Sequence, residues 1–115
     1  MQLKIQKYLF DVQTSIDSIF EYLGEQRDFK YYMSNKQLRR SVERELEIIG
    51  EAVNRILHLE PNTPIDDARK IVGLRNMVIH AYDSISNEIV WGIVVNHLPK
   101  LRENVVKLLE SDQSN

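Results

Sequence analysis

Residues 38–56, LRRSVERELEIIGEAVNRI, decide the fold of this chain. Their apolar residues recur at steps of three and four, the period of one face of an α-helix, and charged residues fill the positions between them. No strand-like alternation competes with this pattern. The stretch predicts a long amphipathic helix that ends before Pro61. Its predicted inner face is formed by Leu38, Val42, Leu46, Ile49, Val53 and Ile56.

The same period precedes this helix. Residues 3–23 predict a first helix, and Gly24 is a suitable stop because glycine accepts the backbone angles of a helix end. Residues 24–33 predict a polar and aromatic connection. Ser34, with Gln37 three residues later, has the pattern of a capping box and predicts the start of the second helix.

A third helix is predicted to start at Thr63-Pro64. Threonine caps helices, proline suits the first helical position, and Asp66 and Asp67 favour the positive end of the helix dipole.

A fourth helix over 89–108 follows a break in the pattern at 83–86. Pro99 predicts a kink in it, since its ring removes one hydrogen bond and crowds the preceding turn. The chain of 115 residues fits one domain, so we expect a single all-α domain over 1–115, an up-and-down bundle of four main helices.

The composition points to a cytoplasmic protein. The chain has no cysteine, which excludes disulfides and thiolate metal sites. The amino-terminal residues do not resemble a secretion signal, and no segment approaches the ~18 apolar residues of a membrane span. A net charge of −2 and a pI near 5.9 give no global attraction for nucleic acid.

Residues 25–44 carry a local excess of three positive charges. They are either a local site for a polyanion or a solvated helix face of mixed charge, and the second reading is the commoner one. The residues are Arg27, Lys30, Lys36, Arg39, Arg40 and Arg44 against Glu25, Asp28 and Glu43.

The segment 75–82, RNMVIHAY, concentrates candidate functional groups in an apolar context. Arg75 can hold a phosphate, and His80 can move a proton near neutral pH. Five helical positions separate them by about 140° around the axis, so they share a site only with a distorted helix end or a second chain. Asn76 and His80 are i and i+4 and lie on one face. Alternatively, His80 is a core histidine, Arg75 a structural ion-pair partner and Tyr82 a half-buried phenol.

The pattern Arg75-x4-His80-x-Tyr82 resembles the signature of the HEPN superfamily, in the form found in HepT-like toxins. Other segments resemble that family in the same order along the chain, whereas Ala81-Tyr82-Asp83-Ser84 departs from its usual sequence. The segments are Leu46-Glu47-Ile48-Ile49-Gly50-Glu51-Ala52, Gly73-Leu74-Arg75-Asn76, Glu88-Ile89-Val90-Trp91 and Leu98-Pro99.

The resemblance implies a metal-independent RNA endonuclease toxin without a cofactor. It implies a homodimer whose two motifs line one cleft, neutralised by a nucleotidyltransferase antitoxin. His80 would be the general acid or base, Arg75 would bind phosphate oxygens, and Asn76 would orient His80 or a phosphate oxygen. Tyr82 would be the residue that the antitoxin adenylylates.

Two other readings of the chain remain. A catalytically silent HEPN-type module could dock a nucleotidyltransferase or a nucleotide, and a helical interaction protein could have no site.

Glu43, Glu47 and Glu51 form an i, i+4 stripe that is either solvated surface or an ion-pairing face. Trp91, among apolar neighbours, is expected to anchor the core or a dimer rather than to stack on bases.

Overall fold

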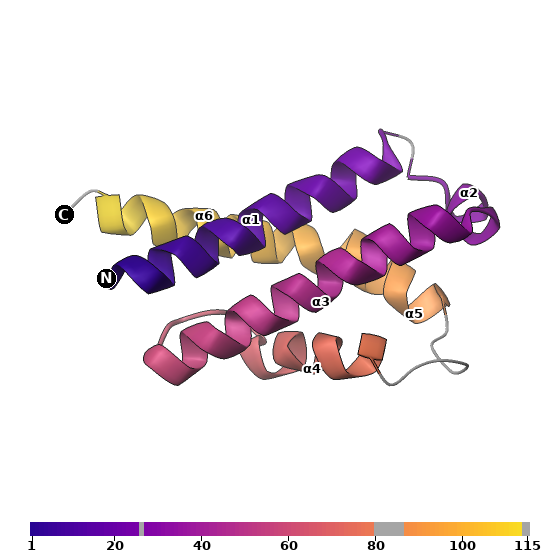
Figure 1. Ribbon diagram of the computed structural model, residues 1–115. Helices are drawn as coiled ribbons and strands as arrows, with labels where there is room; N and C mark the ends of the chain where they lie inside the picture. The colour runs from indigo at the N-terminus through magenta and orange to yellow at the C-terminus, as the bar shows by residue number, and fades with distance from the viewer. Residues whose placement is uncertain (26, 80–86, 114–115) are drawn as a thin grey trace.

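The computed structural model describes residues 1–25, 27–79 and 87–113, and in this part of the chain the regular structure is entirely helical. The long helices run alternately in opposite directions, so the predicted up-and-down bundle of four main helices is confirmed (Figure 1). The first helix begins and the last one ends at the same end of the bundle. The elements are α1 (Leu3–Leu23), α2 (Phe29–Ser34), α3 (Lys36–Leu59), α4 (Ala68–Ile79), α5 (Asn87–Gly92), the π-helical turn η1 (Ile93–His97) and α6 (Leu98–Gln113).

Helix α3 is the central element of the bundle. It packs against α1 along one side and against α4 along another, and α6 covers α1 (Figure 1). All six residues predicted for its inner face are buried, with relative exposures of 8% or less. The periodicity of 38–56 therefore identified both the helix and the side that faces the core.

Helix α1 spans the predicted residues. Gly24 closes it with φ of 73°, a left-handed angle that favours glycine, and its N–H donates to the carbonyl of Phe20 at 3.1 Å. The boundary prediction at this end is confirmed.

The predicted connection over 24–33 is wrong in part, because it contains most of α2. Asp28 caps this short helix by accepting a hydrogen bond from the N–H of Lys30 at 2.9 Å. Tyr32 is fully buried, and its ring lies 5.3 Å from that of Trp91, centroid to centroid. Phe29 joins the cluster at 5.6 Å from Trp91. Trp91 thus contributes to the core, as expected.

The predicted cap of the next helix is also displaced by one residue. Asn35, not Ser34, accepts the N–H of Leu38 at 3.0 Å. Ser34 still belongs to α2 and donates its hydroxyl to the carbonyl of Tyr31. The extended backbone of Asn35 suits a cap, for which asparagine is as good as serine.

The start predicted at Thr63-Pro64 is wrong, because α4 begins at Ala68. Thr63 donates its hydroxyl to the carbonyl of Glu60 and so forms a turn instead of a cap. Asn104 of α6 accepts the N–H of Asp66 at 2.9 Å and donates to the carbonyl of Pro64 at 3.2 Å. This tertiary contact outweighs the local helix signal.

The last helix is irregular next to Pro99, where the sequence predicts a kink: the π-helical turn η1 ends two residues before the proline. The N–H of Leu98 donates to the carbonyl of Ile93, five residues back, so the chain is wound more widely there. A wider turn relieves the crowding of the proline ring against the preceding turn, where proline has no N–H to donate to the helix. The break predicted at 83–86 lies outside the described residues.

Gly50 sets the distance between α3 and α4. A β-carbon at this position would lie 3.0 Å from the backbone N of Arg75 and 3.1 Å from the carbonyl O of Ile71. Both atoms belong to the backbone of α4, so they cannot move aside as a side chain could. The absence of a side chain at Gly50 allows α4 to approach α3 closely at Arg75.

We predict that Gly50→Ala destabilises the fold by about 1–3 kcal/mol, because the added methyl overpacks the contact between α3 and α4. Gly73→Ala is the matched control, since a β-carbon at Gly73 would meet no heavy atom within 4 Å and alanine favours the helix. Urea denaturation of both variants measures the difference. Equal stability of the two variants would show that α4 moves away from α3 without cost.

Candidate functional site

Arg75 and Asn76 lie in the carboxy-terminal half of α4. The preceding residue, Leu74, is buried in the core and fixes the orientation of the helix. Arg75 therefore lies at the border with α3, with 38% of its side chain exposed, whereas Asn76 faces solvent. His80 and Tyr82 lie outside the described residues, so their predicted roles stay predictions.

The guanidinium of Arg75 forms an ion pair and hydrogen bond with Oε2 of Glu51 on α3. The other carboxylate oxygen of Glu51, Oε1, accepts from Nε of Arg55 at 3.0 Å. One carboxylate thus connects two guanidinium groups. The hydrogen bond from Arg75 lowers the pKa of Glu51 below its usual value, against the smaller opposing effect of its partial burial.

The structure therefore supports the interpretation of Arg75 as an ion-pair partner, which does not exclude a second role. A guanidinium held by one carboxylate is oriented in advance and presents further N–H donors, and 38% of the side chain remains exposed. An anion such as a phosphate can bind to these donors or replace Glu51.

Arg75 borders a hollow of 420 Å³ between α1, α3 and α4. Its lining contains three basic and three acidic residues, so it has no net charge. Arg44 forms an ion pair with Glu47 across 3.4 Å. Glu47 and Glu51 of the acidic stripe are thus ion-paired, whereas Glu43 forms no ion pair among the described residues. The lining residues are Tyr8, Asp11, Arg44, Glu47, Ile48, Glu51, Ala52, Arg55 and Arg75.

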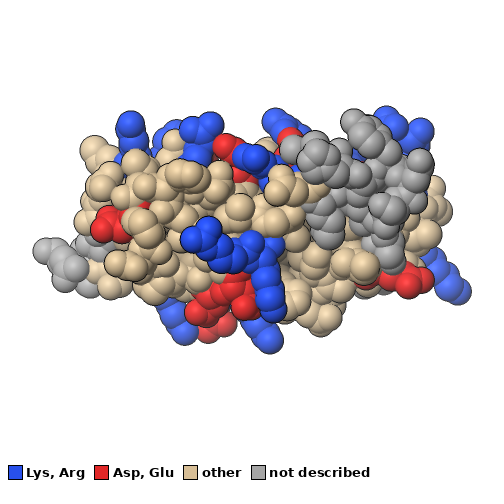
Figure 2. Space-filling model, turned by 90° about the horizontal axis from the view of Figure 1, so that it is seen from below, with Lys and Arg blue, Asp and Glu red and all other residues tan. Residues whose placement is uncertain are grey.

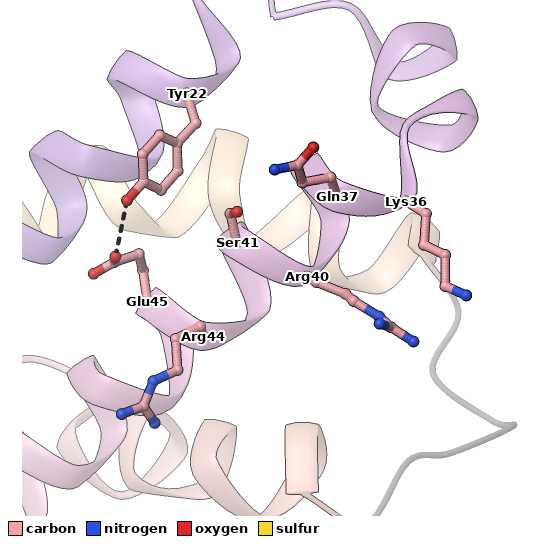
Figure 3. A pocket seen from close by; sticks show the side chains of 7 residues that line it. All are labelled: Tyr22, Lys36, Gln37, Arg40, Ser41, Arg44 and Glu45. Atoms are coloured by element: carbon pink, nitrogen blue, oxygen red, sulfur yellow. Dashed lines mark hydrogen bonds between the residues drawn. The ribbon is translucent and has the colours of Figure 1, made fainter.

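A second, open pocket of 590 Å³ lies between the end of α1 and the start of α3 (Figure 3). The hydroxyl of Tyr22 donates to the carboxylate of Glu45 at 3.2 Å, and the negative charge of Glu45 raises the pKa of Tyr22. Lys36, Arg40 and Arg44 also line this pocket.

The basic residues that lie close together in the sequence over 25–44 have different surroundings in the structure. Arg39 donates to the carbonyl of Met33, and Arg27 lies over the ring of Phe20 at 4.3 Å. Lys36, Arg40 and Arg44, in contrast, gather in one pocket.

Basic and acidic side chains lie side by side on the face shown in Figure 2, in keeping with the small net charge. None of the helices described is long and apolar enough to cross a membrane. The described residues also contain no group of three or more His, Asp or Glu side chains that could hold a metal ion together.

The pairing of Glu51 with Arg75 was not predicted from the sequence. The two residues are 24 positions apart, and only the packing of α4 on α3 brings them together. A signal was nevertheless present: Gly50 directly precedes Glu51, and a glycine inside an amphipathic helix suggests a close approach of another backbone.

Comparisons with known proteins identify the family. A family model described as "Ribonuclease HepT-like" matches residues 12–108, which include α3, α4 and the segment with Arg75. The chain belongs to the HepT-like ribonuclease family. The resemblance to HepT-like proteins noted in the sequence is therefore confirmed at the level of the family.

Named proteins of two archaea are similar to this HepT-like chain over nearly its whole length. "Putative RNase MJ1380" of Methanocaldococcus jannaschii is 34% identical over 105 residues, which cover 88% of this chain and 93% of the relative. "Probable ribonuclease HepT" of Thermococcus cleftensis is 31% identical over 112 residues, which cover 94% and 98%. No solved structure matches the chain significantly.

We predict that Glu51→Gln destabilises this HepT-like protein near neutral pH, and that this effect shrinks as the pH is lowered below the ordinary pKa of glutamate. The folded state lowers the pKa of Glu51, so its stabilising contribution is present above the ordinary pKa of glutamate and disappears as the pH falls through the lowered value. Urea denaturation across this pH range measures the difference between variant and wild type.

The control is the same substitution in an Arg75→Gln background. There the effect of Glu51→Gln at neutral pH should be smaller, because Arg55 alone remains as a partner. A difference between Glu51→Gln and wild type that does not change with pH would contradict a role for the carboxylate charge.

Proposed function

We propose that this protein is a metal-independent RNA endonuclease and the toxin of a toxin–antitoxin module. The observation that carries the proposal is the partly exposed guanidinium of Arg75, oriented by Glu51, in a chain of a ribonuclease family. His80 follows Arg75 by five residues and supplies the group that can transfer protons.

The proposed chemistry uses the 2′-hydroxyl of the RNA as the nucleophile. The hydroxyl gives up its proton as its oxygen forms a bond to the adjacent phosphorus, the bond from phosphorus to the 5′-oxygen breaks, and the leaving 5′-oxygen takes up a proton. His80 moves a proton as general base or acid. Arg75 binds the phosphate oxygens and stabilises the charge that develops on them. Asn76, on the exposed side of α4, orients His80 or a phosphate oxygen.

We predict that Arg75→Ala and His80→Ala each abolish RNA cleavage, and that wild-type cleavage continues in EDTA. Arg75→Lys should restore little activity, because an ammonium cannot replace the bidentate guanidinium. The readout is gel electrophoresis of a labelled RNA, with thermal denaturation of each variant to confirm folding.

Cleavage that stops in EDTA and returns with magnesium would contradict the metal-independent mechanism. A folded wild-type protein that does not cut RNA would instead favour the catalytically silent module, which docks a nucleotidyltransferase or nucleotide.

The proposal includes a homodimer, because a second chain can supply the groups that one helix cannot place together. An apolar groove of 540 Å³ between α4 and the start of α6 supports such an interface. Ile71, Ile93 and Leu101 contribute to its apolar lining, while charged residues such as Lys70 and Lys100 also border it. This arrangement resembles the apolar centre and polar rim of protein interfaces.

We predict a sedimentation mass near 27 kDa at micromolar concentration, twice the 13.5 kDa of one chain. Ile93→Glu should shift it towards the monomer, because a charge would enter the groove. Val95→Glu is the matched control in the same helical turn, since Val95 is 37% exposed and does not line the groove. A wild-type protein that sediments as a monomer would refute a cleft formed by the motifs of two chains.

We further propose that a nucleotidyltransferase antitoxin neutralises the toxin by adenylylating Tyr82. The added phosphate is negatively charged and would occupy the space near Arg75 and His80 that RNA phosphate needs. The intact mass of the protein produced together with such an enzyme tests this step, with Tyr82→Phe as the variant that must remain unmodified.

A further inference from the structure

Three basic side chains form a line on α3. Lys36, Arg40 and Arg44 follow one another at intervals of four residues, so a strand along the helix axis would pass one positive charge about every 6 Å. Figure 3 shows their side chains leaving α3 on the same side, whereas Gln37, Ser41 and Glu45 lie on the side of Tyr22. We call Lys36, Arg40 and Arg44 the basic track.

The basic track is largely free of ion pairs. Within the part of the chain that the structure describes, neither Lys36 nor Arg40 lies within ion-pair distance of a carboxylate. Arg44 pairs with Glu47 across 3.4 Å, but 65% of its side chain is exposed. The three charges are therefore available to a ligand.

Helix stability does not explain the position of Lys36. Lys36 is the first residue of α3, and the first turn contains no acidic residue. The amino-terminal end of a helix has a partial positive charge, which favours acidic residues and disfavours basic ones. A ligand with several negative charges would give Lys36, together with Arg40 and Arg44, a role in binding.

An aromatic ring forms the opposite wall of the same pocket. Tyr22 is 43% exposed, and its hydrogen bond to Glu45 fixes the ring and engages the one acidic group of the lining. Gln37 and Ser41 lie between the ring and the basic track and offer polar contacts. A basic line beside an exposed ring is the combination that binds single-stranded nucleic acid.

The basic track leads towards Arg75. Arg44 lines both the pocket of Tyr22 and the hollow that Arg75 borders. The two cavities are thus neighbours along α3, and a chain bound to the basic track can continue to the guanidinium of Arg75.

We propose that the basic track binds the backbone of single-stranded RNA, with a base stacked on Tyr22, and guides the strand to Arg75. The identity of the ligand as RNA rests on the proposed function. A single strand fits better than a duplex, because bases are free to reach the ring only when they are unpaired.

The test uses a short fluorescent single-stranded RNA in which every 2′-hydroxyl is methylated, so that binding is measured without cleavage. The variant replaces Lys36, Arg40 and Arg44 with Gln. The control replaces Lys7, Arg69 and Lys107 with Gln, three exposed basic residues that line neither the pocket of Tyr22 nor the hollow of Arg75. They belong to the first half of α1, the start of α4 and the second half of α6, away from the start of α3 (Figure 1). Both proteins lose the same formal charge.

Fluorescence anisotropy at several salt concentrations gives the affinity and its salt dependence. Loss of three phosphate contacts should weaken binding at least about tenfold and reduce the slope of log K against log [salt] by about 2, at roughly 0.7 per contact. The control should keep the wild-type affinity and slope. Equal behaviour of variant and control would overturn the proposal.

Tyr22 gives an independent measurement. Tyr22→Ala should weaken binding about tenfold without changing the salt slope, because stacking involves no charge, and Tyr22→Phe should retain most of the affinity. If Tyr22→Ala binds as tightly as wild type, the stacking part of the proposal is wrong.

The outcomes separate this proposal from the proposed function. If the wild-type protein cuts RNA and the variant of the basic track still binds RNA normally, RNA binding by the basic track is refuted. The proposed ribonuclease activity then remains. A wild-type protein that does not cut RNA but binds it through the track would refute the nuclease and support the track. Wild-type protein without measurable RNA binding would refute the track.

Discussion

The close contact between α3 and α4 at Gly50 is the constraint on which the candidate site depends. A β-carbon there would meet the backbone of Arg75 itself, so the residue that lets the helices approach also sets the position of the guanidinium. Glu51, the next residue on α3, then lies within reach of Arg75. Two adjacent residues of α3 thus set the distance between α3 and α4 and place a carboxylate beside Arg75.

The ion pair between Arg75 and Glu51 can serve both folding and function. In the absence of a ligand it satisfies a guanidinium that lies partly between two helices. A phosphodiester of RNA offers the same geometry of two oxygens and the same single negative charge, so it can compete for that guanidinium. The carboxylate still has Arg55 as a partner when Arg75 turns to a ligand. The exchange leaves no buried charge alone.

Sequence patterns predicted the parts of this structure that depend on local periodicity. The bounds of α1, the inner face of α3 and the disturbance at Pro99 follow from spacing and from the chemistry of single residues. The patterns failed where distant residues decide the outcome. Asn104 holds the segment before α4 in a turn, although Thr63 and Pro64 favour a helix start.

The candidate site likewise combines a feature that the local sequence predicted with a pairing that depends on distant residues. Arg75 could be selected from the sequence because of its type and its neighbours, whereas its pairing with Glu51 required the packing of two helices. The sequence showed the excess of basic residues over 25–44, but it did not show which of them lie together in the structure. Arg27 and Arg39 turn to other partners, and only the residues on one face of α3 gather in a pocket.

The position of the chain ends has a practical consequence. The beginning of α1 and the end of α6 lie together at one end of the bundle, and the start of α3 lies at the other (Figure 1). A tag, fluorophore or additional domain attached to either terminus would therefore extend away from the start of α3. Fusion proteins and surface-immobilised forms of this domain would leave that end open to large ligands.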